Sequence, residues 1–383
     1  MTAPGERTNG RADERADEPT DDRPGGRALD LGPLDARVPE ILRGTAAYHV
    51  PAPPRVIAKL DANELPYGLP AELRAELGQV LAEVALERYP DASARRLRAV
   101  VARQHGVSGD QIVFGNGSDE LIAMLCSAFA APRGARPAAI LYPEPSFVYY
   151  RLSAIARGVE PIAVPLTAAF ELDEAAVLRA VEDHRPSVVF LALPNNPTGT
   201  LWRVGFAAEL AARHRDVAVI SDEAYFAYSG ATSLPVLADH PNLIVMRTLS
   251  KLGMAGLRVG FTISSPAIAA LLEKLRPPYN VSALDQRAAE FLLERATGWC
   301  AARAADVVTE RSRLAAALTA RGFEVFPSEA NLVLIRTGDA TALWKRLADA
   351  GVTVRLFDAG RLAGCLRITV GTPAETDALL AAL

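Results

Sequence analysis

The sequence predicts an α/β fold, in which a large domain with a mainly parallel, helix-covered sheet is followed by a smaller α+β domain. From about residue 70 to residue 276, short apolar runs alternate with longer segments of helical character. Continuous apolar runs are typical of strands buried on both faces, and their alternation with helices is typical of parallel sheets. A break at Pro277-Pro278 precedes a long helical stretch over about 282–321 and a second set of short apolar runs, which together predict the smaller domain.

The expected strands of the large domain are rich in Val, Ile, Leu and Phe. They cover residues 112–114, 139–142, 188–193, 217–221, 243–248 and 259–262. Helices are expected between them over 93–105, 118–130, 173–183 and 205–214. The small domain is expected to contribute strands at 331–335, 352–356 and 366–370.

Four regions are predicted along the chain. Residues 1–30 are rich in charge, Gly, Pro and Thr and lack apolar periodicity, so we expect a disordered tail. Residues 31–60 are expected to form an arm that packs with the small domain or with a partner subunit. The large domain is expected over 61–276 and the small C-terminal domain over 277–383.

Composition excludes several classes of function. The formal net charge of the 383 residues is −4, which offers no bulk basic field for nucleic acid or for an anionic membrane. No apolar stretch reaches the roughly 18 residues of a membrane-spanning helix, and no signal peptide is expected. Three isolated cysteines and five histidines show no metal-ligand spacing, so we expect no metal site and a reducing, cytoplasmic location.

Lysine is unusually scarce in this chain. Lys59, Lys251, Lys274 and Lys345 are four of the 41 basic residues, and the remaining 37 are Arg. A sequence with this bias is expected to keep Lys where Arg cannot serve. An amine nucleophile is such a place, because guanidinium stays protonated whereas the lysine amine can lose its proton.

A glycine-containing segment, Phe114 to Glu120, follows the first expected strand and opens a helix. Gly115 and Gly117 let the backbone approach an anion, and the new helix offers free N–H groups and its positive dipole end. The pattern indicates a phosphate cradle, with a plain turn and helix cap as the alternative. A nicotinamide dehydrogenase is disfavoured, because Glu120 stands where a dinucleotide fingerprint needs a third Gly.

Two further polar segments follow buried strands. The loop 193–199, Leu-Pro-Asn-Asn-Pro-Thr-Gly, is rigid and fixes an amide in place. Asp222 leaves a strand at its carboxyl end, and Tyr225 follows three residues later. A buried carboxylate needs a partner, and a protonated heterocyclic nitrogen would serve. An ordinary turn and a surface cluster of Glu, Asp and Tyr are the alternatives.

The segment 247–260 brings together an amine, a hydroxyl and a guanidinium. Ser250 and Arg258 suit a phosphate, while Lys251 could attack a carbonyl. A lysine on a solvated turn is the alternative, which the scarcity of Lys disfavours. The four elements together suit pyridoxal 5'-phosphate (PLP), which needs a Schiff-base lysine, an acidic partner for its ring nitrogen, donors for its phenolate oxygen and a phosphate cup.

The chain resembles the fold-type I, class I/II PLP-dependent aminotransferases from about residue 40 to the end. The resemblance depends on Asn-Asn-Pro-Thr-Gly at 195–199, Asp-Glu-Ala-Tyr at 222–225 and Ser-Lys at 250–251 with the downstream Arg258. Within that superfamily the chain most resembles the histidinol-phosphate aminotransferases, through the segments 59–68, 88–91, 247–251 and 365–372.

The resemblance implies roles around the cofactor ring. Lys251 would form the Schiff base and later move the proton during transamination, and Asp222 would keep the ring nitrogen protonated. Asn196 and Tyr225 would hold the phenolate oxygen. Phe147 would stack on the ring, since stacking needs only an aromatic face.

The resemblance also implies a phosphate site and a shared active site. The backbone amides of Ser118 and Asp119, with Ser250 and Arg258, would bind the cofactor phosphate. Tyr89 would reach that phosphate from the neighbouring subunit, which implies a homodimer.

Four residues are substrate-binding candidates. Arg367 would hold an α-carboxylate in a bidentate fork, for which Arg is suited. Arg355, twelve residues earlier, and Tyr48 are candidates for a second anion site that would receive a substrate phosphate. Asn63 lies in the segment 59–68 and is the fourth candidate.

The implied function is transfer of the amino group of L-histidinol phosphate to 2-oxoglutarate in histidine biosynthesis, by a ping-pong mechanism. An aromatic or other amino-acid aminotransferase and a PLP-dependent decarboxylase of a phosphorylated amino acid are alternatives. A non-catalytic, ligand-sensing protein of the same fold is a remote one, because the first 40 residues are too short and too poor in apolar periodicity for a DNA-binding domain.

Overall fold

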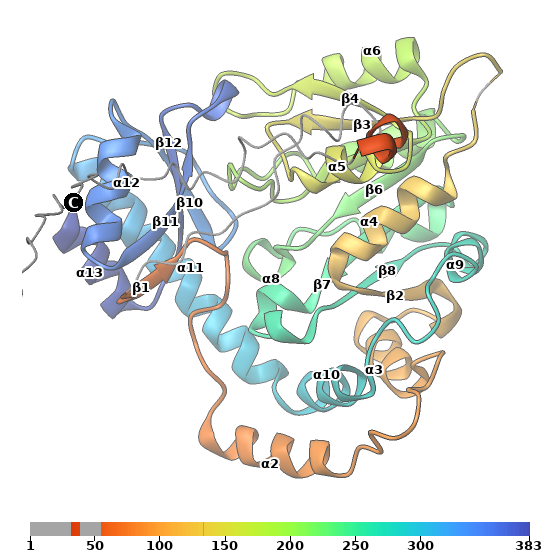
Figure 1. Cartoon of the computed structure of the whole chain (residues 1–383), viewed down its shortest axis with the longest axis horizontal. Helices are drawn as coiled ribbons and strands as arrows, with labels where there is room; N and C mark the ends of the chain where they lie inside the picture. The colour runs from red at the N-terminus through yellow and green to blue at the C-terminus, as the bar shows by residue number, and fades with distance from the viewer. Residues whose placement is uncertain (1–31, 39–54, 133) are drawn as a thin grey trace, which may run out of the picture. The chain divides into compact units, whose positions relative to one another are not determined.

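A computed structural model describes residues 32–38, 55–132 and 134–383 (Figure 1). The chain divides into two units, 1–52 and 53–383. In the first unit the described residues form the short helix η1 (Gly32–Arg37). The predicted tail 1–30 and the substrate-binding candidate Tyr48 lie outside the described residues. All other candidate site residues belong to the second unit.

Among the described residues, seven strands form the larger sheet, in the order β2-β8-β7-β6-β5-β3-β4. The strands are β2 (Ile112–Asn116), β3 (Ala139–Glu144), β4 (Glu160–Pro165), β5 (Val188–Ala192), β6 (Ala218–Asp222), β7 (Leu243–Thr248) and β8 (Val259–Ile263). The pairs that involve β8 are antiparallel, and the others are parallel. This agrees with the mainly parallel sheet that the apolar runs predict.

Helices cover both faces of this sheet, and the alternation of side chains along each strand creates two cores. Val189 and Leu191 of β5 pack in one apolar cluster, whereas Val188 and Phe190 pack in another. The first cluster draws on α3 (Arg95–His105), α6 (Glu174–His184), α7 (Gly205–Arg213) and α10 (Ala283–Arg295), and the second on α4 (Gly117–Ala128), α5 (Tyr149–Ile155) and α9 (Pro266–Glu273). A strand with both faces covered must be apolar at every position, which is why the central strands read as continuous apolar runs.

Within the described residues, a second sheet has five strands in the order β1-β11-β12-β10-β9. The strands are β1 (Ala58–Leu60), β9 (Glu324–Val325), β10 (Leu332–Arg336), β11 (Val352–Phe357) and β12 (Cys365–Thr369). β1, which precedes the large sheet in sequence, pairs in parallel with β11. The end of the predicted arm therefore forms an edge strand of the small sheet.

In the described part of the chain, three helices pack with the small sheet, namely α11 (Thr297–Ala320), α12 (Ala340–Asp349) and α13 (Pro373–Ala382). The long α11 runs from α10 toward this sheet (Figure 1). A capping box between Thr372 and Glu375 begins α13. The remaining helices of the second unit include α2 (Ala71–Ala82) and the one-turn α8 (Phe226–Ser229), which contacts α11.

The structure differs from the predicted elements at several places, and the short strands β1 and β9 are among the elements that were not predicted. The single helical stretch expected over 282–321 is two helices, α10 and α11, because Ala296 between them leaves helical geometry with φ −109° and ψ 1°. The strand β4 was not predicted. Its alternating burial and its prolines, Pro161 and Pro165, are typical of an edge strand, where a missing N–H is tolerated.

The structure also bears on two features that the sequence argues against, a membrane-spanning helix and a metal site. In the described ranges, no helix combines the length and apolar character needed to traverse a bilayer. Groups of three or more metal-ligating side chains are likewise absent from the part of the chain that the structure describes.

Candidate active site

The polar segments lie at one edge of the large sheet, where three neighbouring parallel strands end. β5 leads into Asn195 and Asn196, β6 ends on Asp222, and β7 leads into Ser250 and Lys251. The carboxyl ends of adjacent parallel strands meet at the same edge, where α/β proteins bind their ligands. The strand order therefore brings together motifs that are up to 56 residues apart in sequence.

Lys251 lies in the short helix η4 (Leu249–Leu252) directly after β7. Its side chain is half-buried, with Nζ 5.9 Å from the centroid of the Tyr225 ring. Burial lowers the pKa of Lys251 to about 8, and the nearby guanidinium groups of Arg367 and Arg258 act in the same direction. The environment therefore raises the fraction of neutral amine, which is the nucleophilic form.

Asp222 is buried at the end of β6, and both of its carboxylate oxygens accept hydrogen bonds. The hydroxyl of Tyr150 donates to Oδ2 at 2.5 Å, and the backbone N–H of Ala224 donates to Oδ1 at 3.2 Å. Burial raises the pKa of Asp222 to about 6, against the effect of these two hydrogen bonds. Such a carboxylate gains from a cationic N–H partner.

Arg367 on β12 joins the small sheet to the loop after β5. Its Nη1 donates to Oδ1 of Asn196 at 2.7 Å, and its Nη2 donates to the carbonyl oxygen of Asp61 at 2.5 Å. Asn63 donates from Nδ2 to the hydroxyl of Tyr225 at 2.8 Å. Burial raises the pKa of Tyr225 above its ordinary value, so the phenol keeps its proton and can act as a hydrogen-bond donor.

The segment predicted to be a phosphate cradle lies where α4 begins beside β8. The backbone N–H of Gly117 donates to the carbonyl oxygen of Arg258 at 2.5 Å. The guanidinium of Arg258 donates to Asp119 at 2.9 Å and to Oγ of Ser250 at 3.3 Å. Ser118 occupies the first turn of α4, whose free N–H groups and dipole attract an anion.

This cradle depends on glycine at two close approaches. A Cβ at Gly117 would lie 2.6 Å from Nη2 of Arg258, and a Cβ at Gly260 would lie 2.7 Å from the backbone carbon of Gly117. Only glycine lets the strand, the helix start and the guanidinium converge in this way. Together with Lys251 and Asp222, the cradle fits PLP, whose aldehyde and electron-withdrawing ring would supply the amino-transfer chemistry when bound.

We expect Gly260→Ala to weaken PLP binding at least about tenfold and to destabilise the fold by about 1–3 kcal/mol, because the new methyl group must displace backbone. Gly256→Ala is the matched control, since a Cβ at Gly256 meets nothing within 4 Å. Cofactor titration by absorbance and thermal melting would measure both effects. If the two variants behave alike, the cradle does not depend on this approach.

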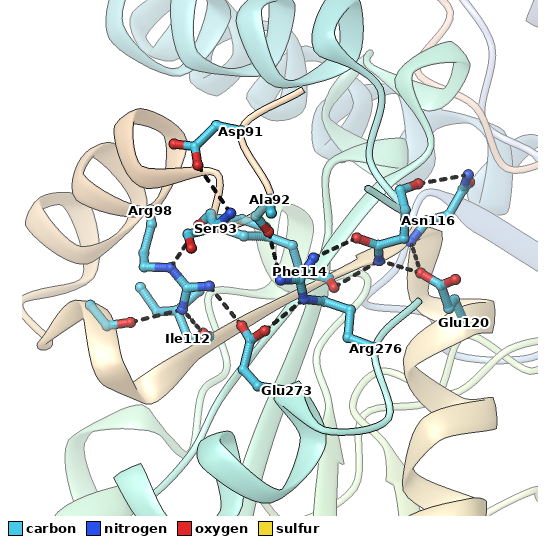
Figure 2. Close-up of polar contacts among 12 residues, drawn as sticks. Asp91, Ala92, Ser93, Arg98, Ile112, Phe114, Asn116, Glu120, Glu273 and Arg276 are labelled. Atoms are coloured by element: carbon cyan, nitrogen blue, oxygen red, sulfur yellow. Dashed lines mark hydrogen bonds and ion pairs between the residues drawn. The ribbon is translucent and has the colours of Figure 1, made fainter. Parts of the chain in front are cut away.

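A polar network supports the start of α4 from outside the cradle (Figure 2). Glu120 accepts from Asn280 at 2.6 Å, and Asn280 accepts in turn from Arg276 at 2.9 Å. Glu273 then bridges Arg276 and Arg98, with 2.7 Å to each. These contacts fix the helix start relative to α3 and α9.

The same network reaches the loop that follows Tyr89. Arg276 donates to the carbonyl oxygen of Ala92 at 2.6 Å, and Arg98 donates to that of Ser93 at 3.1 Å (Figure 2). Tyr89 is 81% exposed and stacks on Tyr279 with ring centroids 4.6 Å apart. Its exposure leaves most of this side chain accessible to a neighbouring molecule.

Phe147 and Arg355 are the remaining candidates in the described residues, and each neighbours a residue of the site. Phe147 is half-buried and packs edge to face on Tyr150 at 5.7 Å. Arg355 on β11 is directly opposite Arg367 in the antiparallel register with β12. Two guanidinium-bearing residues therefore occupy paired positions on the small sheet.

Several residues at the site were given no role of their own by the sequence analysis. Asn195, fully buried, holds the loop after β5 by donating to the carbonyl oxygen of Pro145 and to Thr198. Tyr150 binds Asp222, and Glu223 forms a buried ion pair with Arg247. The sequence does carry a weak signal for the ion pair, since Glu223 and Arg247 stand at the ends of adjacent expected strands.

Comparisons with known proteins agree with this geometry. Residues 55–383 match the family model described as aminotransferase class I and II. The histidinol-phosphate aminotransferase of Methylibium petroleiphilum is 44% identical over 360 residues, covering 92% of this chain and 95% of that protein. Histidinol-phosphate aminotransferase 2 of Burkholderia pseudomallei is 46% identical over 332 residues, covering 85% of this chain and 91% of that protein.

A solved structure shares both the fold and part of the sequence. The crystal structure of histidinol-phosphate aminotransferase from Sinorhizobium meliloti in complex with pyridoxal-5'-phosphate superposes with a TM-score of 0.76 at 27% identity. The match covers 86% of this chain and 90% of that one. The predicted α/β, fold-type I architecture is thereby confirmed, and the chain belongs to the aminotransferase class I and II family.

Proposed function

We propose that this chain is a PLP-dependent transaminase that moves the amino group of L-histidinol phosphate to 2-oxoglutarate, by a ping-pong mechanism in histidine biosynthesis. The observation that carries the proposal is the environment of Lys251. It follows β7 at the sheet edge where the neighbouring β6 ends on the buried Asp222, its amine lies near the Tyr225 ring, and the guanidinium of Arg367 is close enough to lower its pKa. The relatives at 44–46% identity support the choice of substrate.

The residue roles in this proposal follow the geometry. Lys251 would attach the cofactor through its amine and would then carry the proton that leaves the α-carbon of the substrate to the cofactor. Asp222 pairs with the ring nitrogen, and Tyr225 and Asn196 hold the phenolate oxygen. Phe147 offers an aromatic face to the ring.

The arginine pair suits the two substrates of a ping-pong reaction. 2-Oxoglutarate carries two carboxylates, whereas L-histidinol phosphate carries one phosphate and no carboxylate. We assign the α-carboxylate to Arg367 and the second anionic group, phosphate or distal carboxylate, to Arg355. Asn63 contributes by orienting the Tyr225 hydroxyl.

A shared active site completes the proposal. Tyr89 is exposed, and its loop is tied to the phosphate cradle of its own subunit by Arg276. We propose a homodimer in which Tyr89 reaches the phosphate of the neighbouring subunit, and a monomeric mass in solution would exclude it. The three cysteines are buried, free thiols, which fits the reducing environment of a cytoplasmic enzyme.

A half-reaction screen tests the substrate. The PLP-loaded enzyme is mixed with L-histidinol phosphate, L-histidinol, phenylalanine or threonine phosphate, and the change in the cofactor absorbance is followed. L-Histidinol phosphate should react fastest. A faster reaction with phenylalanine would indicate an aromatic aminotransferase, and release of carbon dioxide from threonine phosphate would indicate a decarboxylase.

Arg355→Ala sharpens this test. It should lower kcat/KM for L-histidinol phosphate about 10- to 100-fold, because a charge-assisted hydrogen bond contributes about 1.5–3 kcal/mol. The rate with unphosphorylated L-histidinol should change little. Arg346→Ala, which removes an exposed arginine of α12, is the matched control. Equal losses with both donors would remove Arg355 from the phosphate site.

A further inference from the structure

Tyr150 is a fully buried tyrosine without a role in the proposed function. It lies in α5, with 0% of its surface exposed, and its ring stacks on Phe190 with centroids 4.5 Å apart. Its hydroxyl donates a hydrogen bond of 2.5 Å to Oδ2 of Asp222. This buried phenol donates its one O–H to the carboxylate that is proposed to face the cofactor. Its hydrogen bond therefore bears directly on the chemistry of the site.

The Asp222 carboxylate is held from the protein side at both ends. Ala224 donates its backbone N–H to Oδ1, while Tyr150 donates to Oδ2. Two donors on opposite oxygens prevent rotation of the carboxylate, and each oxygen keeps a second lone pair for another donor. Of these two donors, the phenol can be removed by substitution of its side chain, whereas the backbone amide cannot.

We propose that Tyr150 is a positioning residue that holds Asp222 as an oriented anion, so that the proton shared with the cofactor stays on the ring nitrogen. The inference rests on the proposed use of PLP. One proton is at issue, and it resides either on the ring nitrogen or on the carboxylate. A hydrogen bond donated to the anion stabilises the first arrangement and not the second.

The charges around Asp222 show why such a donor is needed. Burial raises the pKa of Asp222, and the carboxylates of Glu223 and Asp119 act in the same direction. Glu223 is itself paired with Arg247, and Asp119 with Arg258, so neither neighbouring cation is available to Asp222 alone. The hydrogen bonds from Tyr150 and Ala224 oppose this shift.

Tyr150 itself stays a donor. Burial raises the pKa of the Tyr150 phenol well above its ordinary value, and the adjacent Asp222 charge raises it further. The Tyr225 phenol also lies close to this carboxylate, and its pKa is likewise raised. Neither phenol therefore loses its proton near neutral pH, and the hydrogen bond to Asp222 persists over the working range of the enzyme.

A purely structural role is the competing explanation, because the Tyr150 ring also supports Phe147 edge to face. Tyr150→Phe separates the two explanations, since it keeps the ring and removes only the hydroxyl. Tyr142→Phe is the matched control. It removes a hydroxyl from another buried tyrosine of the same apolar cluster, on β3 and away from the Asp222 hydrogen bonds.

The experiment compares binding of PLP with binding of 1-deaza-PLP, in which a carbon replaces the ring nitrogen. Tyr150→Phe should weaken PLP binding about tenfold or more, since hydrogen bonds to charged groups are the stronger class. Its affinity for the deaza analogue should equal that of the wild type, because no ring nitrogen is left to protonate. Tyr142→Phe should bind both molecules as the wild type does.

A second measurement reads the proton itself. With ¹⁵N-labelled PLP, the nitrogen chemical shift of the wild type should report a protonated ring nitrogen at neutral pH. In Tyr150→Phe the carboxylate competes better for the proton, so the ring nitrogen should lose it at a lower pH. In an Asp222→Asn background, Tyr150→Phe should have no further effect on the ratio of the two affinities.

The outcomes are distinguishable. If the wild type binds no PLP, the proposed function fails. If the wild type binds PLP but Tyr150→Phe weakens both cofactors equally, or weakens neither, the proposed function stands and the role of Tyr150 is overturned. An unchanged nitrogen titration in Tyr150→Phe would overturn it as well.

Discussion

Lys251→Ala should lose essentially all transaminase activity. Proton transfer by a positioned side chain is worth about 10²- to 10⁴-fold, and the variant would lose covalent attachment of the cofactor in addition. Lys251→Arg should be equally inactive, although it keeps the positive charge, because guanidinium stays protonated and is no nucleophile. The four lysines of the chain make this a clean experiment.

Borohydride reduction of the PLP-loaded enzyme, followed by peptide mass analysis, measures the attachment directly. The label should appear on the peptide that contains Lys251 and be absent from the Lys251→Ala protein. Lys274→Ala, which removes an exposed lysine after α9, is the control and should be labelled normally. Label at any other lysine in the wild type would contradict the proposed site.

The pH dependence of attachment provides a further check on the same residue. Attachment needs the neutral amine, and burial lowers the pKa of Lys251 from 10.5 to about 8. The attachment rate should therefore rise with pH and level off above about 8. A rate that continued to rise toward pH 10 would mean that the amine is solvated in the folded protein.

Most of the fold could be predicted because the sheet is buried. The runs at 188–193, 243–248 and 259–262 are continuous apolar segments because helices cover both faces of the sheet, so local composition reflects the tertiary position. β4 is an edge strand with an alternating pattern and two prolines, and so lacked that signal. The division between α10 and α11 at Ala296 has only a weak local signal, since alanine favours helix and Gly298, two residues later, disfavours it.

The candidate site was predictable where one residue type is required by the chemistry. Lys251, Asp222 and Asn196 follow buried strands, and the strand order brings them together at one edge. Tyr150 could not be found in this way. It lies on a helix 72 residues before its partner Asp222, in a segment that reads as apolar core. Nothing local distinguishes a buried tyrosine that donates to a carboxylate from one that only packs.

Contacts between residues that lie far apart in the sequence could not be predicted either. The pairing of Arg355 with Arg367 depends on the register between β11 and β12, which spacing alone does not fix. The network of Glu273, Arg276 and Asn280 joins elements that are up to 175 residues apart. Taken singly, Glu273 and Arg276 read as ordinary surface charges and Asn280 as an ordinary polar residue.

Arg247→Ala should be among the most destabilising substitutions in the chain. Arg247 and Glu223 form an ion pair at 2.8 Å whose side chains are 6% and 0% exposed. Glu223 also accepts from Ser221 and from the backbone of Ser233, and the Arg247 guanidinium lies 3.7 Å from the centroid of the Phe226 ring. Removing the arginine leaves a buried carboxylate without its cation.

The expected loss is about 3–5 kcal/mol of unfolding free energy, the range for breaking one side of a buried pair. The pair also lines a cavity of about 340 Å³, which would let water reach the orphaned carboxylate and favours the lower end of that range. Because Glu223 follows Asp222 and Arg247 precedes Lys251 by four residues, cofactor affinity should fall together with stability. Chemical denaturation and cofactor titration would measure the two effects.

Two further variants separate pairing from simple loss of charge. Glu223→Gln combined with Arg247→Met should cost less than the sum of the two single substitutions, because no unpaired charge then remains buried. Arg295→Gln is the control for an exposed pair. Arg295 is 58% exposed in its contact with Glu76, so its loss should change the unfolding free energy by no more than about 1 kcal/mol. If Arg247→Ala costs as little as this control, the pair is hydrated in solution, and the rigidity it would give to the strand ends carrying Asp222 and Lys251 must come from the apolar core instead.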